Sequence, residues 1–403
     1  MNLQKAINEI IRENNIQNPD VTISPATRGG YFGDPSKIKI EGTSAANEKK
    51  SFHLFLKSIP KSMPATLPGH QAYMNEITMY RDAFPTFSEF QEEKGVTEPF
   101  DSTVKCHKCS DVEFKEFLIF DDLTEMGFVL WDKKNPMTSQ CIELILKQTA
   151  KFHAVSFALR DQRPQVFSNL SEKLYCNTMI DFFKNPDNLH LSKLNSEIAL
   201  ECIDKVKEEN VYKIYKNFIE NDLKTAALHC SVMDKTVIIH GDRWCNNFMF
   251  KFEDSQNMKS INKAVFLDWQ CSRLSSPVVD LCYFLYCNAP QEVFDNLDCY
   301  LKLYHDSLSL ALTEMGTDVQ KVFSFNDLQN HWKLYSKFGL VMAASLLNMY
   351  YNPIHNEALD MEQIGSNKDD LTKSFVNSDI VKNEIFKERM RGIIVHFVNN
   401  GFI

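Results

Sequence analysis

The chain is 403 residues long, enough for two or three cooperating structural units. Hydrophobic residues make up 44% of it and charged residues 24%, which is typical of folded globular proteins and argues against a disordered or fibrous chain. The formal net charge of −9 disfavours a general affinity for nucleic acid or anionic membranes, so we expect neither as a partner.

Three further features favour a cytoplasmic protein. Charged residues interrupt the apolar side chains of residues 1–15, which predicts an amphipathic helix rather than a secretory signal. The longest nearly apolar run, residues 338–351, is shorter than the roughly 18–20 residues that cross a bilayer, so it is interpreted as a buried helix. The 11 cysteines follow no repeating framework, which favours reduced thiols.

The beginning of the chain predicts a small β-rich unit. A glycine-bearing turn at residues 28–34 is followed by strand-like stretches at 37–40 and 52–56. A helix is predicted over residues 70–84 because large apolar side chains recur one turn apart, and Pro85 is expected to end it.

A further strand is predicted at residues 113–120, and the acidic residues 121–122 that follow it indicate a hinge. Upstream, Cys106 and Cys109 have the spacing of half a zinc site. No second pair of Cys or His lies nearby at ligand spacing, so a loop with two free thiols is the preferred interpretation.

From about residue 136 the apolar pattern becomes helical. Helices are predicted at residues 141–160, 191–209, 212–230 and 279–288, with more beyond residue 290. Together the elements predict an α+β fold in which residues 1–122 form a small β-rich lobe with one helix, and residues 123–403 form a larger, mainly helical lobe.

The strongest sign of chemistry lies at residues 237–250, where an apolar strand ends in a polar turn and then resumes. This turn holds Asp242 and Asn247, close enough in sequence for one short loop to bring them together. The carboxylate would accept a proton from a substrate, and the amide oxygen would bind a hard cation. His240 directly follows the apolar strand, which favours a bracing role over acid–base chemistry.

Two other segments are expected to complete this site. The strand at residues 264–267 ends at Asp268, and a hairpin would return that carboxylate to Asn247, as a magnesium–triphosphate site requires. Lys57 ends a strand-like stretch, and Glu76 lies on the inward face of the next helix, where a buried carboxylate needs a partner. Lys57 and Glu76 therefore predict an ion pair that would hold nucleotide phosphates.

The order of these parts resembles that of protein-kinase-like phosphotransferases. HGDRWCNNFMF at 240–250, FLDWQ at 266–270 and PVVDLCYF at 277–284 are most similar to the ecdysteroid kinase-like family, in the aminoglycoside and choline kinase branch of that superfamily. The resemblance implies a two-lobed kinase that uses ATP and Mg²⁺ to phosphorylate a hydroxyl group of a small molecule.

The same resemblance implies a role for each matched residue. Asp242 is expected to be the catalytic base, and Asn247 and Asp268 the magnesium ligands, while Lys57 and Glu76 hold the phosphates. Asp280, like His240, would brace the catalytic loop. The other expected nucleotide contacts come from the glycine turn and the hinge: Gly30, Gly33, Phe120, Asp121 and Leu123.

The acceptor is less well defined than the reaction. The resemblance suggests an ecdysteroid or a similar lipophilic alcohol. A choline-type kinase, a protein kinase and a catalytically silent nucleotide-binding scaffold of the same fold remain as alternatives. The short interval between Asp268 and Asp280 contains no A-P-E segment, which disfavours a peptide acceptor, and the full set of polar groups disfavours a silent scaffold.

Overall fold

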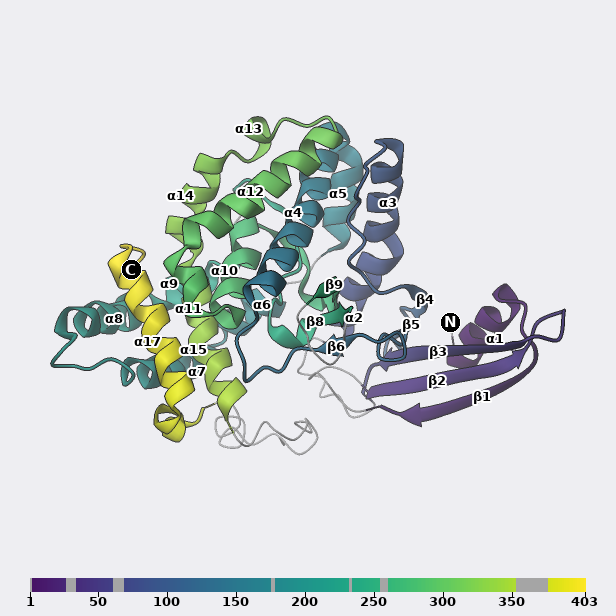
Figure 1. Cartoon of the computed structure of the whole chain (residues 1–403), viewed down its shortest axis with the longest axis horizontal. Coiled ribbons are helices and arrows are strands. Elements are labelled where there is room, and N and C mark those ends of the chain that lie inside the picture. Colours follow the sequence, from purple (N-terminus) through teal and green to yellow (C-terminus); the bar gives the residue numbers. More distant parts are fainter. Residues whose placement is uncertain are drawn as a thin grey trace.

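The computed structural model describes residues 2–26, 34–60, 69–174, 178–231, 234–253, 260–352 and 376–403. It has an α+β fold with a five-stranded antiparallel sheet in its N-terminal part and helices in most of the rest (Figure 1). The strands follow the order β1-β2-β3-β5-β4. Their bounds are β1 (Gln17–Pro25), β2 (Asp34–Thr43), β3 (Lys49–Ser58), β4 (Cys106–Ser110) and β5 (Phe117–Asp121).

The alternation of side chains along β3 decides what each face of the sheet carries. Leu54 and Leu56 are buried in one cluster with residues of α1 (Leu3–Glu13), whose first turn is capped by Asn2. Phe55 therefore faces the opposite side, where it packs against a second cluster, and Lys57 shares that face. Lys57 thus points away from α1.

The helix after β3 continues past its predicted end. It comprises α2 (Gly69–Thr78), a π-helical turn (Met79–Ala83) and α3 (Phe84–Glu93), so the prediction that Pro85 terminates it is wrong. Pro85 lies in the first turn of α3, where a missing N–H costs little. Phe87 and Phe90 of α3 are buried in the large core of the helical part.

The C-terminal part is mainly helical, as predicted, with some different bounds. The residues predicted as one helix at 191–209 form a helix only to Leu200, and those at 212–230 lie in two helices. The helices are α4 (Ser139–Gln162), α5 (Pro164–Lys173), α6 (Thr178–Lys184), α7 (Pro186–Leu200), α8 (Glu209–Asn221), α9 (Leu223–Leu228), α10 (Pro277–Asn288), α11 (Gln291–Asp295), α12 (Leu297–Glu314), α13 (Val319–Val322), α14 (Phe325–Tyr335), α15 (Lys337–Tyr351) and α17 (Glu384–Asn399).

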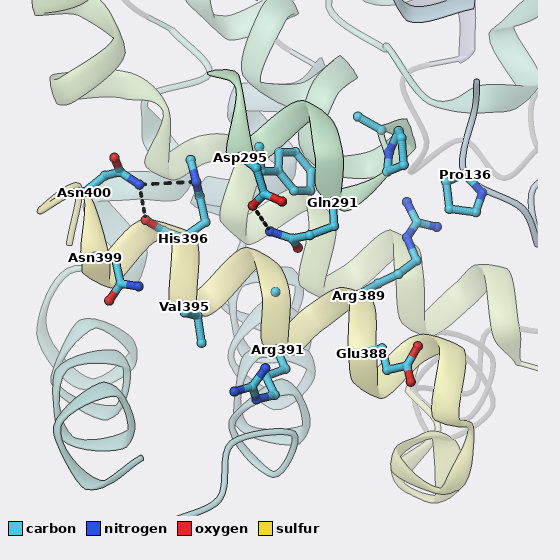
Figure 2. Close-up of a pocket in the computed structure, with 14 residues that line it drawn as sticks. Pro136, Gln291, Asp295, Glu388, Arg389, Arg391, Val395, His396, Asn399 and Asn400 are labelled. Carbon is cyan, nitrogen blue, oxygen red and sulfur yellow. Dashed lines mark hydrogen bonds between the residues drawn. The ribbon is translucent and has the colours of Figure 1, made fainter. Parts of the chain in front are cut away.

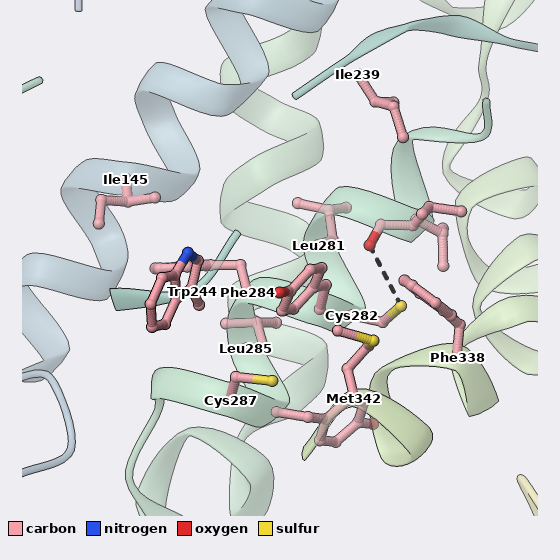
Figure 3. Packing of buried hydrophobic residues seen from close by; sticks show 14 of the residues in the cluster. Ile145, Ile239, Trp244, Leu281, Cys282, Phe284, Leu285, Cys287, Phe338 and Met342 are labelled. Atoms are coloured by element: carbon pink, nitrogen blue, oxygen red, sulfur yellow. Dashed lines mark hydrogen bonds between the residues drawn. The ribbon is translucent and has the colours of Figure 1, made fainter. Parts of the chain in front are cut away.

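Helix α10 runs through the centre of this core. All its residues are buried, and Leu281, Cys282 and Phe284 lie among side chains of other helices and strands, including Phe338 and Met342 of α15 (Figure 3). Helix α15 is the buried helix predicted at residues 338–351. Within the described part of the chain, every helix is too short or too polar to cross a membrane.

The strands of two small sheets flank the loops that carry Asp242 and Asp268. One has the order β6-β8-β9, from β6 (Val129–Leu130), β8 (Phe248–Phe252) and β9 (Ile261–Phe266). The other pairs β7 (Val237–Ile239) with β10 (Arg273–Ser275). The predicted hairpin is present as the antiparallel pair β8 and β9. The loop expected at residues 106–109 is instead strand β4, whose thiols are free.

Candidate active site

Three charged side chains from distant parts of the chain meet on the inner face of the sheet. Lys57 Nζ lies 2.6 Å from Glu76 Oε2, so the predicted ion pair is present. Lys57 Nζ also contacts Asp268 Oδ1. Burial lowers the pKa of Lys57, but the charges of Asp268 and Glu76 outweigh it and keep that pKa above its ordinary value. Burial also raises the pKa of Glu76, against the charge of Lys57. Lys57 therefore stays a cation between two acidic groups.

Asp268 is held in place by its backbone and by α2. Its φ of 64° is left-handed, a conformation that costs a residue other than glycine about 1–2 kcal/mol. Asn75 of α2 donates to Gln270 O at 3.0 Å and to Ser272 O at 2.6 Å, just beyond Asp268. The helix that carries Glu76 is thereby tied to the turn that carries Asp268.

The carboxylate of Asp242 has a donor on each oxygen. Tyr283 Oη donates to Oδ1 at 2.8 Å, and Asn247 Nδ2 donates to Oδ2 at 3.0 Å. Burial and the nearby charge of Asp268 raise the pKa of Asp242 to about 6, although both hydrogen bonds lower it. Asp242 is thus a positioned carboxylate that remains mostly ionised at neutral pH.

Asn247 has a fixed amide orientation. Its Nδ2 donates to both the backbone oxygen and the carboxylate of Asp242, which leaves Oδ1 as the atom free to bind a cation. Leu267 N donates to Asn247 O at 2.9 Å, so the hairpin brings the residue before Asp268 against Asn247. Asn247 and Asp268 therefore suit a hard cation that takes its remaining ligands from water and phosphate.

Asp280 supports the loop that carries Asp242. The fully buried carboxylate accepts from the backbone N–H groups of His240 and Gly241, both at 2.8 Å, and from His153 Nε2 at 3.3 Å. Burial raises its pKa, but the His153 hydrogen bond and the Arg243 charge outweigh this effect and lower it below the ordinary value. Asp280 has the geometry that a loop brace requires.

His240 forms two hydrogen bonds that fit only its neutral form. Its Nε2 donates to Leu267 O at 2.8 Å, while Nδ1 accepts from Asp242 N at 3.3 Å. Burial, aided by the charge of Arg243, lowers its pKa to about 4. His240 thus joins the Asp242 loop to Leu267, the residue between β9 and Asp268.

The Asp242 loop also requires glycine at position 241. Gly241 has a φ of +83°, and a Cβ there would collide with Arg273 Nη1 and Cys271 O. Gly316 has a similar φ of +76° with open space around it. We expect Gly241→Ala to lower the free energy of unfolding well beyond the about 1–2 kcal/mol of backbone strain alone, whereas Gly316→Ala should show little more than that strain. Chemical denaturation of both variants measures the difference; equal losses would contradict the close packing.

Stability should fall in mild acid because of the buried histidines. Unfolded His240 takes up a proton near pH 6.5, but folded His240 does so only near its pKa of about 4. Between these values the unfolded state binds more protons, so the free energy of unfolding decreases as pH falls, by ~3 kcal/mol for one such group. The lowered pKa of His153 acts in the same direction.

Denaturation curves across this pH window test the prediction. A His240→Asn variant cannot titrate, so it should show a shallower pH slope than the wild type, while substitution of the exposed His190 by Gln should leave the slope unchanged. An unchanged slope in His240→Asn would show that His240 is not the titrating group.

Three residues that build this site were not predicted from the sequence: Tyr283, Asn75 and Arg243. Arg243 is fully buried, contacts Thr149 Oγ1, and lies over the rings of Phe248 and Phe266 at 4.9 and 4.5 Å. Burial lowers its pKa to about 10. All three act on residues distant in sequence, so no local pattern reveals their roles. The available signal is that Arg243 and Tyr283 lie within the family motifs and that Asn75 precedes Glu76.

The predicted hinge residues lie at the end of β5 and just beyond it. Phe120 and Leu123 are buried, while the Asp121 carboxylate pairs with His107 at 2.6 Å. The N–H of Asp121 donates to Lys105 O and that of Asp122 to His53 O, so neither group is available to a ligand. No described residue accepts a hydrogen bond from the Leu123 N–H.

Two predicted site residues, Gly30 and Gly33, lie outside the described residues.

Cys245, beside Asn247, is buried, and burial raises its thiol pKa to about 11, which makes it a poor nucleophile. Among the described residues no group of three or more His, Cys, Asp or Glu side chains is arranged to hold a metal ion. A cation here would therefore rest on one carboxylate and one amide.

A cavity of 640 Å³ lies elsewhere, between α11 and α17 (Figure 2). Gln291 and Asp295 of α11 line one side, and Arg389, Val395 and His396 of α17 line the other. None of the predicted site residues is among those that line it. The cavity is thus separate from the cluster around Asp242 and Asp268.

The comparisons with known proteins agree with the motifs. A model of the ecdysteroid kinase-like family matches residues 29–317. The match includes Lys57, Glu76, Asp242, Asn247 and Asp268, and it covers more than half of the chain. No curated protein matches the chain.

Proposed function

The chain belongs to the ecdysteroid kinase-like family, and on that premise we propose that it transfers the γ-phosphoryl group of ATP to a hydroxyl group of a small molecule. The observation that carries the proposal is the convergence of Lys57 and Glu76 with Asp268, while the hairpin links Asp268 to Asn247 and Asp242. Phosphoryl transfer depends mainly on positioning and charge, and this cluster supplies both.

Asp242 would orient the acceptor hydroxyl and take its proton. Tyr283 and Asn247 each donate one hydrogen bond to a different carboxylate oxygen. The remaining lone pairs of both oxygens are available to the substrate. A pKa of about 6 keeps the group mostly ionised at neutral pH yet basic enough to accept a proton.

Asn247 and Asp268 would hold Mg²⁺, and Lys57, fixed by Glu76, would bind phosphate oxygens. Bound Mg²⁺ supplies positive charge that offsets the charge of the transferred phosphoryl group. The amide orientation of Asn247 and the partial exposure of Asp268 (23%) support these roles. At the hinge, the Leu123 N–H is a suitable donor for the adenine base.

For the acceptor we propose an ecdysteroid or a similar lipophilic alcohol, which acts as substrate in the cytoplasm. The family resemblance supports this class, and the free thiols fit a reducing compartment. A catalytically silent nucleotide-binding scaffold of the same fold is the second candidate, because a complete set of side chains does not by itself demonstrate turnover.

Mass spectrometry of hydroxylated compounds incubated with the protein, ATP and Mg²⁺ tests the proposal. The panel contains ecdysteroids, sterols, choline and plant phenolics, each with a parallel Asp242→Asn reaction. We expect a phosphate-sized gain on an ecdysteroid or sterol that is absent from the control. Nucleotide binding without any phosphorylated product would favour the scaffold, and a gain on choline alone would assign a choline-type kinase.

A further inference from the structure

A bulge in β4 places two cysteines on the same face of the sheet. Residues three apart in a regular strand point to opposite faces. In β4, Cys106 pairs with Phe120 and Cys109 with Leu118, but the register shifts between them because His107 is an extra residue. Cys106 and Cys109 therefore share a face, and both pack against the cluster that contains Leu118 and Phe120.

Each of the two thiols, which share this face, also affects the pKa of the other. Cys106 Sγ donates to Lys108 O at 3.5 Å, and the nearby thiol of Cys106 lowers the pKa of Cys109 to about 7, against burial and the charges of Asp111 and Asp82 but with help from Arg81. The proximity of Cys109, with burial, raises the pKa of Cys106. Both side chains are only partly buried. At neutral pH a substantial fraction of Cys109 is thus a reachable thiolate, while Cys106 is a thiol.

We propose that Cys106 and Cys109 are an oxidisable pair that forms a reversible disulfide within β4 on reaction with a hydroperoxide. The Cys109 thiolate attacks the peroxide, so an S–O bond forms, the O–O bond breaks and an alcohol leaves after taking up a proton. The Cys106 thiol then loses its proton and displaces the sulfenic oxygen as water, which forms the S–S bond. The two thiols are oxidised by two electrons, and the hydroperoxide is reduced to alcohol and water.

The position of the pair connects its oxidation to the hinge. His107, which lies between the two cysteines, contacts Asp121 at 2.6 Å, and Lys105 O accepts from Asp121 N at 3.1 Å. Closing the disulfide tightens the bulge and displaces His107, so the end of β5 moves with it. Weaker nucleotide binding is the expected consequence, and this part rests on the proposed function.

The other described cysteines lack this arrangement. Burial raises the pKa of Cys202 to about 12 and that of Cys245 to about 11, which leaves little thiolate. Cys299 is exposed, which makes Cys299→Ser a matched control for a reachable thiol outside the pair.

Peptide mapping of the full chain, reduced and then treated with tert-butyl hydroperoxide, tests the proposal. We expect the peptide that contains both cysteines to lose two hydrogen atoms and to regain them with a dithiol, in the wild type and in Cys299→Ser. Cys106→Ser should accumulate a sulfenic acid at Cys109 that dimedone traps, whereas Cys109→Ser should leave Cys106 unmodified. Absence of this disulfide, or a disulfide only at other cysteines, would overturn the proposal.

Calorimetric titration with a non-hydrolysable ATP analogue gives an independent readout. We expect the oxidised wild type to bind several-fold more weakly than the reduced protein, and Cys109→Ser to bind equally before and after peroxide. Equal binding by both wild-type forms would overturn the link to the hinge. If the reduced protein binds no nucleotide, the proposed function fails, while the mapping still decides whether the disulfide forms.

Discussion

An Asp242→Asn enzyme is expected to turn over roughly 10²–10⁴-fold more slowly than the wild type, which is the usual contribution of a positioned general base. The amide cannot take a proton from the acceptor hydroxyl. It still offers one oxygen to the two donors that now hold Asp242, Tyr283 Oη and Asn247 Nδ2. One of these donors loses its acceptor, at a cost of ~1–3 kcal/mol, so the protein should remain folded.

Steady-state rates with the acceptor found by mass spectrometry measure this effect. Thermal denaturation and nucleotide titration of the same preparation establish that the fold and the nucleotide site persist. Asp298→Asn, an equivalent change at an exposed position on α12, should retain wild-type rates. Undiminished turnover in Asp242→Asn would remove this residue from the mechanism.

The parts of the site that could be predicted depend on local patterns. Strand alternation places Lys57, helical spacing places Glu76, and two consecutive apolar strands predict the hairpin that returns Asp268 to Asn247. Each prediction needs only period and order along the chain. The two-lobed fold follows from the same patterns together with the family resemblance.

Prediction failed where nonlocal packing or a single side-chain contact decides the outcome. The helical pattern continues beyond residue 200, yet Asp204 accepts from the N–H groups of Val206 and Lys207 and turns the chain before α8. The π-helical turn before Pro85 likewise keeps the chain helical where proline rules predict an end. The loop expected at residues 106–109 is a strand because it pairs with β5, despite the extra residue at the bulge.

The residues behind the active site were missed for a related reason. Tyr283 lies in the apolar run of α10, and its sequence context is that of a core residue. Only the fold shows that its hydroxyl reaches Asp242. The role of Arg243 is equally hard to predict, because arginine side chains are mostly exposed. In the structure Arg243 is buried against aromatic rings.

The second large effect is expected for Asp268→Asn, which should lower Mg²⁺-dependent turnover by roughly 10²–10³-fold, as loss of a charge-stabilising group at a reacting centre does. Asparagine tolerates the left-handed backbone that Asp268 adopts, with its φ of 64°, so the turn should keep its shape. Lys57 retains Glu76 as its partner at 2.6 Å, and the ion pair therefore survives the loss of the second carboxylate.

Rates measured over a Mg²⁺ titration distinguish loss of a metal ligand from loss of an ion pair. If Asp268 binds the metal, its asparagine variant should need far more Mg²⁺ for half-maximal rate. Asp101→Asn is the matched control, because Asp101 contacts Lys263 at 2.6 Å on the exposed surface, where such a pair contributes about 0–1 kcal/mol. That variant should keep the wild-type Mg²⁺ dependence. An Asp268→Asn enzyme with the same Mg²⁺ dependence as Asp101→Asn would assign Asp268 to holding Lys57 alone and would move the metal site elsewhere.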